Sequence, residues 1–508
     1  MVGSCSTPIL LKNSYICLSD MHFSRENITN RIKKMPMAVV VLLFALGIFF
    51  AEYILVPMWG VLLLALLFLV GAVFMRGIYQ RLAVAMMVVM LGVALHSMSS
   101  VGEIPYGREV DMELKITRST ISRGDYSGTE ATICSCEAEE IVGSKVMVWS
   151  DTTTHLSARD RIHLRQKIRP FREERRAYAE LMFHRGFIGS ISIYPSTEYT
   201  LQPALYNSLH DWAVERLRGQ MPTGDARAVA LAMVTGYRGE ISPSLREWYS
   251  FSGASHLLAV SGLHIGIVFM LINLLLLPLL LLPYGNVTRS VVAVLLIWVY
   301  VALCGAPPSA VRAAVMFSLL QISLSTPRSY LSLNVLAATA LLLLLFDTHL
   351  LFDISFQLSF LAVAGILLWA VPLYRVLHTP YRLVNALVAV VMVGLCSTIA
   401  TLPLVSHTFG VVSLIGVLLN PIVILLANLL VMVGVVAMLL PWQPFAYVVE
   451  WVARAQNGLV EWAQSLAWGH LDITIPAYAV WLLYGLFTAI TIFVWSIKWD
   501  RRSEIEDY

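Results

Sequence analysis

The stretch MAVVVLLFALGIFFAEYILV (residues 37–56) has the length and composition of a membrane-spanning helix. A helix needs about 20 predominantly apolar residues to cross the hydrocarbon core of a bilayer. No small-residue cleavage site lies between this stretch and the next apolar run, so it does not have the form of a cleaved signal peptide. The sequence therefore predicts a helix that stays in the membrane.

The composition of the whole chain agrees with that interpretation. Of its 508 residues, 58% are hydrophobic and 13% are charged, whereas soluble domains carry about 25% charged residues. A cytosolic enzyme is excluded first, because no globular core buries so much apolar surface without exposing large patches. The net charge of +3 does not by itself indicate a nucleic-acid-binding protein, and six cysteines are too few for a disulfide scaffold.

Further apolar runs predict a polytopic α-helical membrane protein with about 10–12 transmembrane or half-spanning helices. They cover residues 58–74, 82–98, 255–283, 288–304, 309–325, 333–346, 352–371, 384–404, 411–440 and 478–496. Asn420 and Pro421 interrupt the run 411–440, which either crosses twice or forms a half-helix followed by one span. These two options put the C-terminus on opposite sides, and the choice between them stays open.

Basic residues set the expected orientation and divide the chain into segments. Those before the first run and between the second and third place both sites in the cytoplasm. The predicted segments are an N-terminal cytoplasmic segment (1–36), whose length a misplaced start codon would explain; three transmembrane helices (37–98); an extracytoplasmic β domain (99–203); interfacial amphipathic helices (204–254); a central transmembrane domain (255–440); an interfacial pair of amphipathic helices (441–477); and a last transmembrane helix with a charged tail (478–508).

Residues 103–200 differ in kind from the rest of the chain. They are charged, rich in Thr and Ser, and contain short alternating runs that predict a small β domain. Between Arg159 and Arg185 there are nine Arg or Lys and four Asp or Glu, a local excess of +5. Such a run forms either a phosphate-binding surface or an ordinary solvated one. The candidate surface residues are Arg161, Arg165, Lys167, Arg169, Arg172, Arg175 and Arg176.

Polar residues inside the apolar runs are costly in a bilayer and usually line a cavity. The densest group is SHLLAVSGLHIG (residues 255–266). On one helix Ser261 and His264 share a face, and His256 lies about 80° from His264. This wall of two imidazoles and a hydroxyl either lines a polar path or joins neighbouring helices as a packing contact.

A second group, GAPPSAVR (residues 305–312), predicts a broken helix. Its two prolines end the preceding helix, and Ser309 is placed to cap a new one that carries Arg312 in its first turn. A helix that begins at membrane depth points its amide donors at an anion. The alternative is a structural salt bridge between Arg312 and an aspartate, for which Asp353 is a candidate if it is not a helix N-cap. Gln357 and Asn420 are further polar residues of the same region.

These strings together resemble the competence domain of the ComEC family. The resemblance rests, in order, on GYRGEISPSLR (236–246), HLLAVSGLHIG (256–266), PSAVR (308–312), DISFQLS (353–359) and the segment 409–420. GIFFA (47–51) resembles the family's first span, and DRIHL (160–164) with YAELMFHRGF (178–187) resembles its extracytoplasmic OB-like domain. The resemblance covers most of residues 37–440. Arg159-Asp160 stands where the family has Gly-Asp.

The resemblance implies an inner-membrane channel that moves single-stranded DNA into the cytoplasm during natural transformation, with neither a catalytic residue nor a cofactor. The eight polar residues of the central domain would line the DNA path: His256, Ser261, His264, Ser309, Arg312, Asp353, Gln357 and Asn420. The sequence holds no Gly-x-x-x-x-Gly-Lys-Ser/Thr loop for ATP. It also lacks the His-x-His-x-Asp-His site of longer members. We therefore expect a cytoplasmic ATPase or helicase, a separate nuclease and a periplasmic DNA-receptor protein as partners.

Two other classes of protein remain as alternatives. One is a membrane-embedded metal-dependent enzyme with His256, His264 and Asp353 as zinc ligands. Metal analysis of the purified protein separates it from a channel. The other is a small-anion transporter with a sensory outer domain, which binding assays with an oligonucleotide and small anions would separate.

Overall fold

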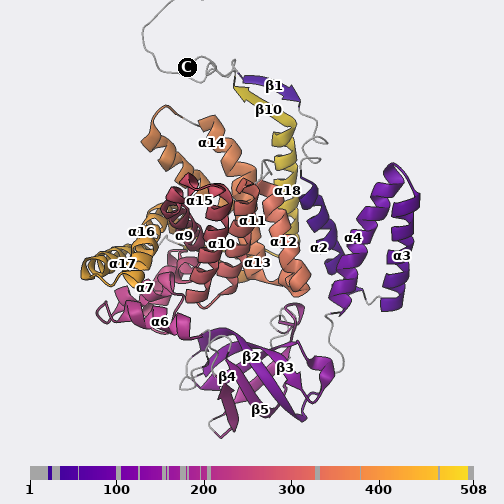
Figure 1. Ribbon diagram of the computed structural model, residues 1–508, viewed down its shortest axis with the longest axis horizontal. Coiled ribbons are helices and arrows are strands. Elements are labelled where there is room, and N and C mark those ends of the chain that lie inside the picture. The colour runs from indigo at the N-terminus through magenta and orange to yellow at the C-terminus, as the bar shows by residue number, and fades with distance from the viewer. Residues whose placement is uncertain are drawn as a thin grey trace, which may run out of the picture.

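A bundle of apolar helices lies between a small β domain and a pair of short strands formed by residues 21–25 and 497–501 (Figure 1). The computed structural model describes residues 21–25, 35–54, 57–98, 104–123, 126–151, 156, 160–171, 179, 182–194, 196–202, 207–325, 332–377, 379–466 and 470–501. Among these residues six helices are long and apolar enough to cross a membrane, and five shorter apolar helices accompany them. The predicted helical architecture with an inserted β domain is confirmed.

The first three helices form a group of their own at the side of the bundle (Figure 1). Helix α2 (Pro36–Tyr53) crosses α4 (Ile78–Met98), and α3 (Met58–Phe74) packs on α4. The crossing is close because glycine lies on both sides of it. A Cβ atom on Gly47 would overlap the Val89 carbonyl oxygen, and one on Gly92 would overlap the Phe44 carbonyl oxygen. Small residues permit such an approach between membrane helices.

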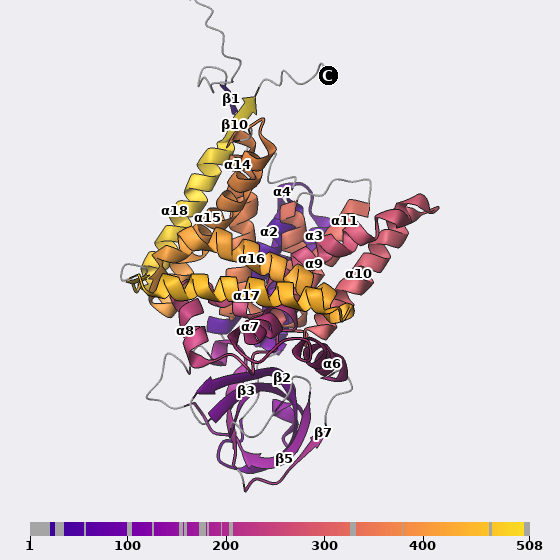
Figure 2. The same ribbon diagram turned by 90° about the vertical axis from the view of Figure 1, so that its left-hand side faces the viewer.

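The β domain is a six-stranded sheet that curls on itself (Figure 2). Its strands are β2 (Glu109–Arg123), β3 (Tyr126–Cys136), β4 (Lys145–Asp151), β5 (Arg161–Lys167), β6 (Phe187–Ile193) and β7 (Tyr199–Gln202), in the order β6-β4-β3-β2-β5-β7. All neighbours are antiparallel except β4 and β6. A bridge between Arg169 and Ser190 brings the end of β5 to β6, so the sheet is a partly closed barrel around an apolar core.

The central bundle follows, and its core contains a helix predicted to be interfacial. Helix α7 (Asp225–Val234) lies between α6 (Asn207–Arg218) and α8 (Pro243–Phe251) in the chain. Its residues 228–234 are all buried, and it packs against α16 (Leu414–Leu439) and α17 (Gln443–Gln464). The small side chains of α7, mostly Ala and Val, let other helices cover residues 228–234 on every side. The prediction that residues 204–254 lie at the membrane interface stays a prediction.

The remaining elements complete the bundle. They are η4 (Ser255–Leu258), α9 (Gly262–Leu275), η5 (Leu277–Leu281), α10 (Gly285–Leu303), α11 (Pro308–Ser325), α12 (Ser332–Phe346), η6 (Thr348–Phe352), α13 (Ile354–Gly365), η7 (Ile366–Ala370), α14 (Val371–Leu377), α15 (Arg382–Phe409) and α18 (Ala477–Ser496). Short strands β8 (Val411–Ser413) and β9 (His470–Asp472) pair with each other.

Two predictions for the C-terminal third are wrong. The run 411–440 neither crosses twice nor breaks in its middle, because α16 continues through Pro421 as one helix. A proline removes only one backbone donor, which a packed membrane helix tolerates. Within 441–477 the described residues form one helix, α17 (Gln443–Gln464), in place of a pair of helices, and the short strand β9 follows it. Helix α17 lies alongside α16 across the bundle (Figure 2).

The first and last strands of the described chain lie side by side. Strand β1 (Met21–Arg25) pairs antiparallel with β10 (Ile497–Arg501) at the end of the bundle away from the β domain (Figure 1). The orientation predicted for the N-terminus therefore applies to the C-terminal strand as well.

The glycine contact between α2 and α4 gives a test of this packing. Replacing Gly92 with Leu should lower the thermal midpoint of unfolding in detergent, because overpacking a helix contact costs about 1–3 kcal/mol. Gly394, on α15, is the matched control, since a Cβ atom there would meet nothing within 4 Å. A Gly92→Leu variant as stable as Gly394→Leu would contradict the close crossing.

Candidate functional site

Helix α9 begins inside the bundle, and Ser261 is its N-cap. The Ser261 hydroxyl accepts a hydrogen bond from the His264 backbone N–H (3.4 Å), and the Ser261 N–H donates to His264 Nδ1 (3.4 Å). The prediction that Ser261, His264 and His256 share one helix is wrong, because the chain breaks between η4 and α9. Ser261 forms the start of the helix instead of part of its wall.

The two histidines of this region differ in environment. His256 is exposed, and its Nδ1 donates to the Gly253 carbonyl oxygen (3.3 Å). His264 is fully buried, and its Nε2 has no hydrogen-bond partner among the described residues. Because Nδ1 of His264 accepts a hydrogen bond, the proton of the neutral ring lies on Nε2. The Nε2–H of His264 is therefore a buried donor that lacks an acceptor. It costs free energy unless another group accepts its hydrogen bond.

Helix α11 begins beside the start of α9. Ser309 was predicted to cap α11, but the helix starts at Pro308 and the Ser309 hydroxyl instead donates to the Val260 carbonyl oxygen (2.6 Å). The two helices run parallel from this point, with the rings of Phe269 and Phe317 stacked further along at 4.8 Å. Ser309 thus joins two helix starts.

Arg312, in the first turn of α11, reaches a third helix start. It is buried, and its Nη2 donates to the carbonyl oxygen (3.0 Å) and the hydroxyl (2.8 Å) of Ser355, in the first turn of α13. Asp353 is the N-cap of α13, as one of its two predicted roles required, and accepts from the Phe356 N–H at 3.1 Å. The other predicted role is a salt bridge between Asp353 and Arg312. Asp353 pairs instead with the guanidinium of Arg185.

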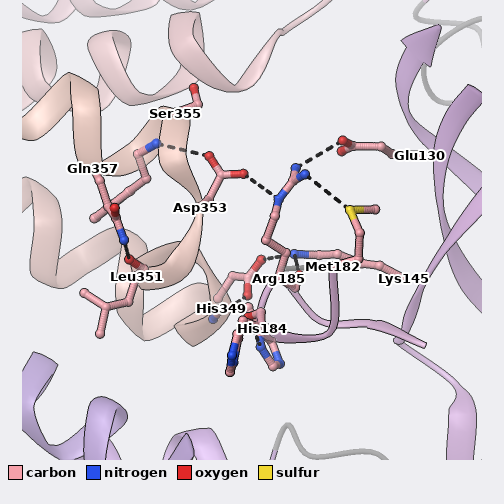
Figure 3. Close-up of polar contacts among 12 residues, drawn as sticks. Glu130, Lys145, Met182, His184, Arg185, His349, Leu351, Asp353, Ser355 and Gln357 are labelled. Atoms are coloured by element: carbon pink, nitrogen blue, oxygen red, sulfur yellow. Dashed lines mark hydrogen bonds and ion pairs between the residues drawn. The ribbon is translucent and has the colours of Figure 1, made fainter. Parts of the chain in front are cut away.

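Arg185 connects these helix starts to the β domain. It lies just before β6, and its Nε donates to Asp353 Oδ2 (3.0 Å) while its Nη2 donates to Glu130 of β3 (3.1 Å) (Figure 3). Only 19% of its side chain is exposed, so the bonds lie largely out of water. The barrel therefore contacts the start of α13 through Asp353, and Ser355, two residues further along the same helix, contacts Arg312.

A second group of contacts, next to the Arg185–Asp353 pair, also holds the β domain against the helices. Lys145 of β4 donates to Asp347 (2.7 Å). Glu52, at the end of α2, accepts from His96 Nε2 (2.6 Å) and from His184 of the β domain. His349 Nδ1 donates to the His184 carbonyl oxygen (3.3 Å) (Figure 3). Sequence reasoning missed this interface, although Glu52, an acid inside the first apolar run, was a signal.

The predicted outer basic surface is largely neutralised. Arg161, Arg165 and Lys167 lie exposed on one face of β5, and Arg169 follows the strand. Strand β2 places Glu109 opposite Lys167, Asp111 opposite Arg165, and Glu113 opposite His163. Arg161 donates to Glu113 (2.8 Å), and Lys167 lies 3.8 Å from Glu109. Arg172, Arg175 and Arg176 lie outside the described residues.

Gln357 and Asn420, the last two residues predicted to line the path, take no part in the contacts that join the starts of α9, α11 and α13. Gln357 Nε2 donates to the Leu351 carbonyl oxygen (2.8 Å), which stabilises the turn before α13. Asn420 lies inside α16, and its Oδ1 is buried with no hydrogen-bond partner in the described part of the chain. Of the predicted path residues, Ser261 and His264 thus contact each other directly, and Ser309 and Arg312 both lie in the first turns of α11.

The predicted zinc ligands do not assemble. Asp353 is engaged by Arg185 and by the start of α13, and within the described residues no group of three His, Cys, Asp or Glu side chains is arranged to hold a metal ion. The site instead offers helix N-termini, a buried guanidinium and a buried imidazole donor. Such groups bind anions, since amide dipoles and cations both favour negative charge.

The fold and the site define a multi-pass helical membrane protein whose inserted β barrel docks onto a group of helices that begin inside the bundle. Residues 233–498, more than half of the chain, match the family model described as Competence protein. The chain belongs to this family of ComEC-type competence proteins.

Two curated relatives were found. The chain is 27% identical to ComE operon protein 3 of Bacillus subtilis (strain 168) over 286 residues, which is 55% of this chain and 35% of that protein. It is 32% identical to an uncharacterized protein of Aquifex aeolicus (strain VF5) over 235 residues, 46% of this chain and 52% of the relative. The chain thus spans about a third and about half of the length of these relatives. No solved structure matches it significantly.

The Arg185–Asp353 contact is open to a double-mutant cycle. Arg185→Met and Asp353→Asn each remove the ion pair, and Asn keeps the N-cap of α13. Because the pair is mostly buried, we expect a coupling free energy of about 2 kcal/mol, measured from hydrogen exchange of the amides of residues 348–352. The exposed pair Arg161 and Glu113 is the control, with about 0.5 kcal/mol expected. Additive single variants at Arg185 and Asp353 would contradict the docking contact.

His349 predicts a pH dependence of stability. Burial lowers the pKa of His349 from its usual 6.5, and nearby His96 and Lys145 act in the same direction against Asp347. A histidine whose pKa is lower in the folded state destabilises the fold as the pH falls below its unfolded pKa. The thermal midpoint should therefore fall between pH 7 and pH 5 less steeply in His349→Gln than in the parent. Exposed His163→Gln should match the parent, and equal slopes in all three proteins would exclude this role for His349.

Proposed function

We propose that this protein is an inner-membrane channel that moves single-stranded DNA into the cytoplasm during natural transformation. The observation that carries the proposal is that the β barrel contacts the start of α13, which Arg312 joins to the start of α11, while Ser309 joins α11 to the residue before the N-cap of α9. Family membership supports a role in DNA uptake. The name of the Bacillus relative, from a competence operon, agrees with it.

The chemistry of the helix starts suits a strand of phosphates. Each nucleotide carries an anion that does not enter hydrocarbon, so the path needs donors and positive charge at membrane depth. The N-termini of α9 and α11 supply amide dipoles, Arg312 supplies a charge, and His264 supplies a donor without an acceptor. None of these groups needs to react, so the proposed role is not enzymatic.

The β barrel would receive the strand outside the membrane. Small barrels of this kind bind oligonucleotides on one sheet face and on adjoining loops. Because acids of β2 offset the basic residues of β5, the contribution of Arg161, Arg165 and Lys167 to phosphate binding should be small. The proposed entry lies instead at the docking side, where Arg185 holds the barrel to α13.

The proposed orientation in the membrane and the proposed partner proteins are those expected from the sequence. The N-terminus lies in the cytoplasm and the β domain outside, and a separate ATPase or helicase draws the strand inward. A separate nuclease removes the other strand, and a periplasmic receptor delivers duplex DNA.

The test uses a transformable host in which the gene for this protein is deleted. The parent chain, Arg312→Met and Arg454→Met are reintroduced, and fluorescent duplex DNA is imaged. Arg454 is the matched control because its side chain is 69% exposed on α17. Losing a charged hydrogen-bond donor should reduce cytoplasmic DNA and transformants by about tenfold or more for Arg312→Met, with DNA held outside the inner membrane and normal protein levels.

Two results would contradict the proposal. Unchanged cytoplasmic DNA in the deletion strain would exclude a role in translocation. Purified protein that binds small anions but no oligonucleotide would favour the small-anion transporter.

A further inference from the structure

A second polar site lies at the opposite end of α9 and α11 from their starts. A cavity of about 330 Å³ opens there between the end of α9, the start of α10 and the end of α11. Its polar lining consists of Asn273, Asn286, Arg289, Ser290 and Gln321. None of these residues contributes to the three helix starts or to the docking of the β domain.

Arg289 gives this cavity its charge. Its Nη2 donates to the Asn273 carbonyl oxygen (3.1 Å), and its Nε is buried without a hydrogen-bond partner among the described residues. No described carboxylate pairs with it, whereas Arg185 and Arg218 each have acidic partners. A guanidinium presents five N–H donors in a fork that matches a phosphate group. The cavity therefore holds a positive charge with unused donors.

The other wall of the cavity is apolar and opens toward the outside of the bundle. It includes Met270, 61% exposed, and Leu324, 70% exposed. Both lie on helices that are predominantly apolar, so these exposed apolar side chains would meet hydrocarbon in a membrane. A ligand that fills this cavity meets a cation and amides on one side and acyl chains on the other. A phospholipid has this combination, and a free phosphate ion or a DNA strand does not.

Hydrogen bonds within the lining keep its shape. Gln321 Nε2 donates to Ser290 Oγ (3.0 Å) and Ser290 Oγ donates to the Asn286 carbonyl oxygen (2.8 Å), which joins α11 to the first turns of α10. Asn273 Nδ2 donates to the Phe269 carbonyl oxygen (3.0 Å). The cavity is thus formed before a ligand enters, which lowers the entropy cost of binding.

We propose that this cavity binds the phosphate group of an anionic phospholipid, with Arg289 as its cationic partner. Basic pockets between membrane helices recognise such headgroups. The helix ends that line the cavity lie toward the end of the bundle where β1 and β10 pair, away from the β domain (Figure 2). With the orientation proposed above, the lipid comes from the cytoplasmic leaflet. The site itself does not depend on the DNA-channel proposal.

The experiment is native mass spectrometry of the full-length protein in detergent, titrated with phosphatidylglycerol or with zwitterionic phosphatidylcholine. The parent should retain phosphatidylglycerol in preference to phosphatidylcholine. Arg289→Gln should weaken retention of phosphatidylglycerol by about tenfold, because a charged hydrogen bond to the phosphate is lost. Arg382→Gln, which removes an exposed charge at the start of α15, should bind like the parent. Circular dichroism and the thermal midpoint check that Arg289→Gln is folded.

Three outcomes would overturn the proposal. Equal retention by the parent and a folded Arg289→Gln would remove Arg289 from the site. Equal loss in Arg289→Gln and Arg382→Gln would indicate a general charge effect. Displacement of the bound lipid by millimolar inorganic phosphate or by a single-stranded oligonucleotide would show that the cavity takes a free anion or DNA in place of a lipid.

Discussion

The contact between Arg185 and Asp353 fixes the geometry on which the rest of the proposed site depends. Asp353 uses one carboxylate oxygen to begin α13 and the other to bind a guanidinium of the β domain. A short aspartate side chain satisfies both only if the barrel lies directly over the helix start. Asp353 therefore links the position of the β domain to the start of α13, where Ser355 contacts Arg312.

Helices that begin within a membrane protein leave amide groups unsatisfied, and each start here is completed in a different way. Ser261 caps α9 with its own side chain, and Asp353 caps α13. Helix α11 begins with Pro308, which needs no partner for its missing N–H. His264 lies in the first turn of α9 and Arg312 in that of α11, so the two helix starts carry further donors where a phosphate chain is proposed to pass.

The sequence was sufficient for the membrane class, the inserted β domain and most helices, because apolar runs and alternating runs have unambiguous periods. It was also sufficient for the polar strings, since the cost of polar groups in a bilayer makes them conspicuous. It could not supply their partners. Ser309 bonds to Val260 and not to its own helix, and Arg312 bonds to Ser355, because long-range contacts leave no trace in spacing. The acids that face β5 were likewise hidden, since strand register depends on the whole barrel.

The central claim is that the starts of α9 and α11 line a path for single-stranded DNA. A photoreactive p-benzoylphenylalanine in place of Leu263, exposed beside the start of α9, tests it directly in cells that are taking up labelled DNA. The same probe in place of Trp481, exposed on the outer helix α18, is the control. We expect single-stranded DNA to crosslink at position 263 and not at 481. Crosslinks that are absent from position 263, or equally strong at both positions, would contradict the claim.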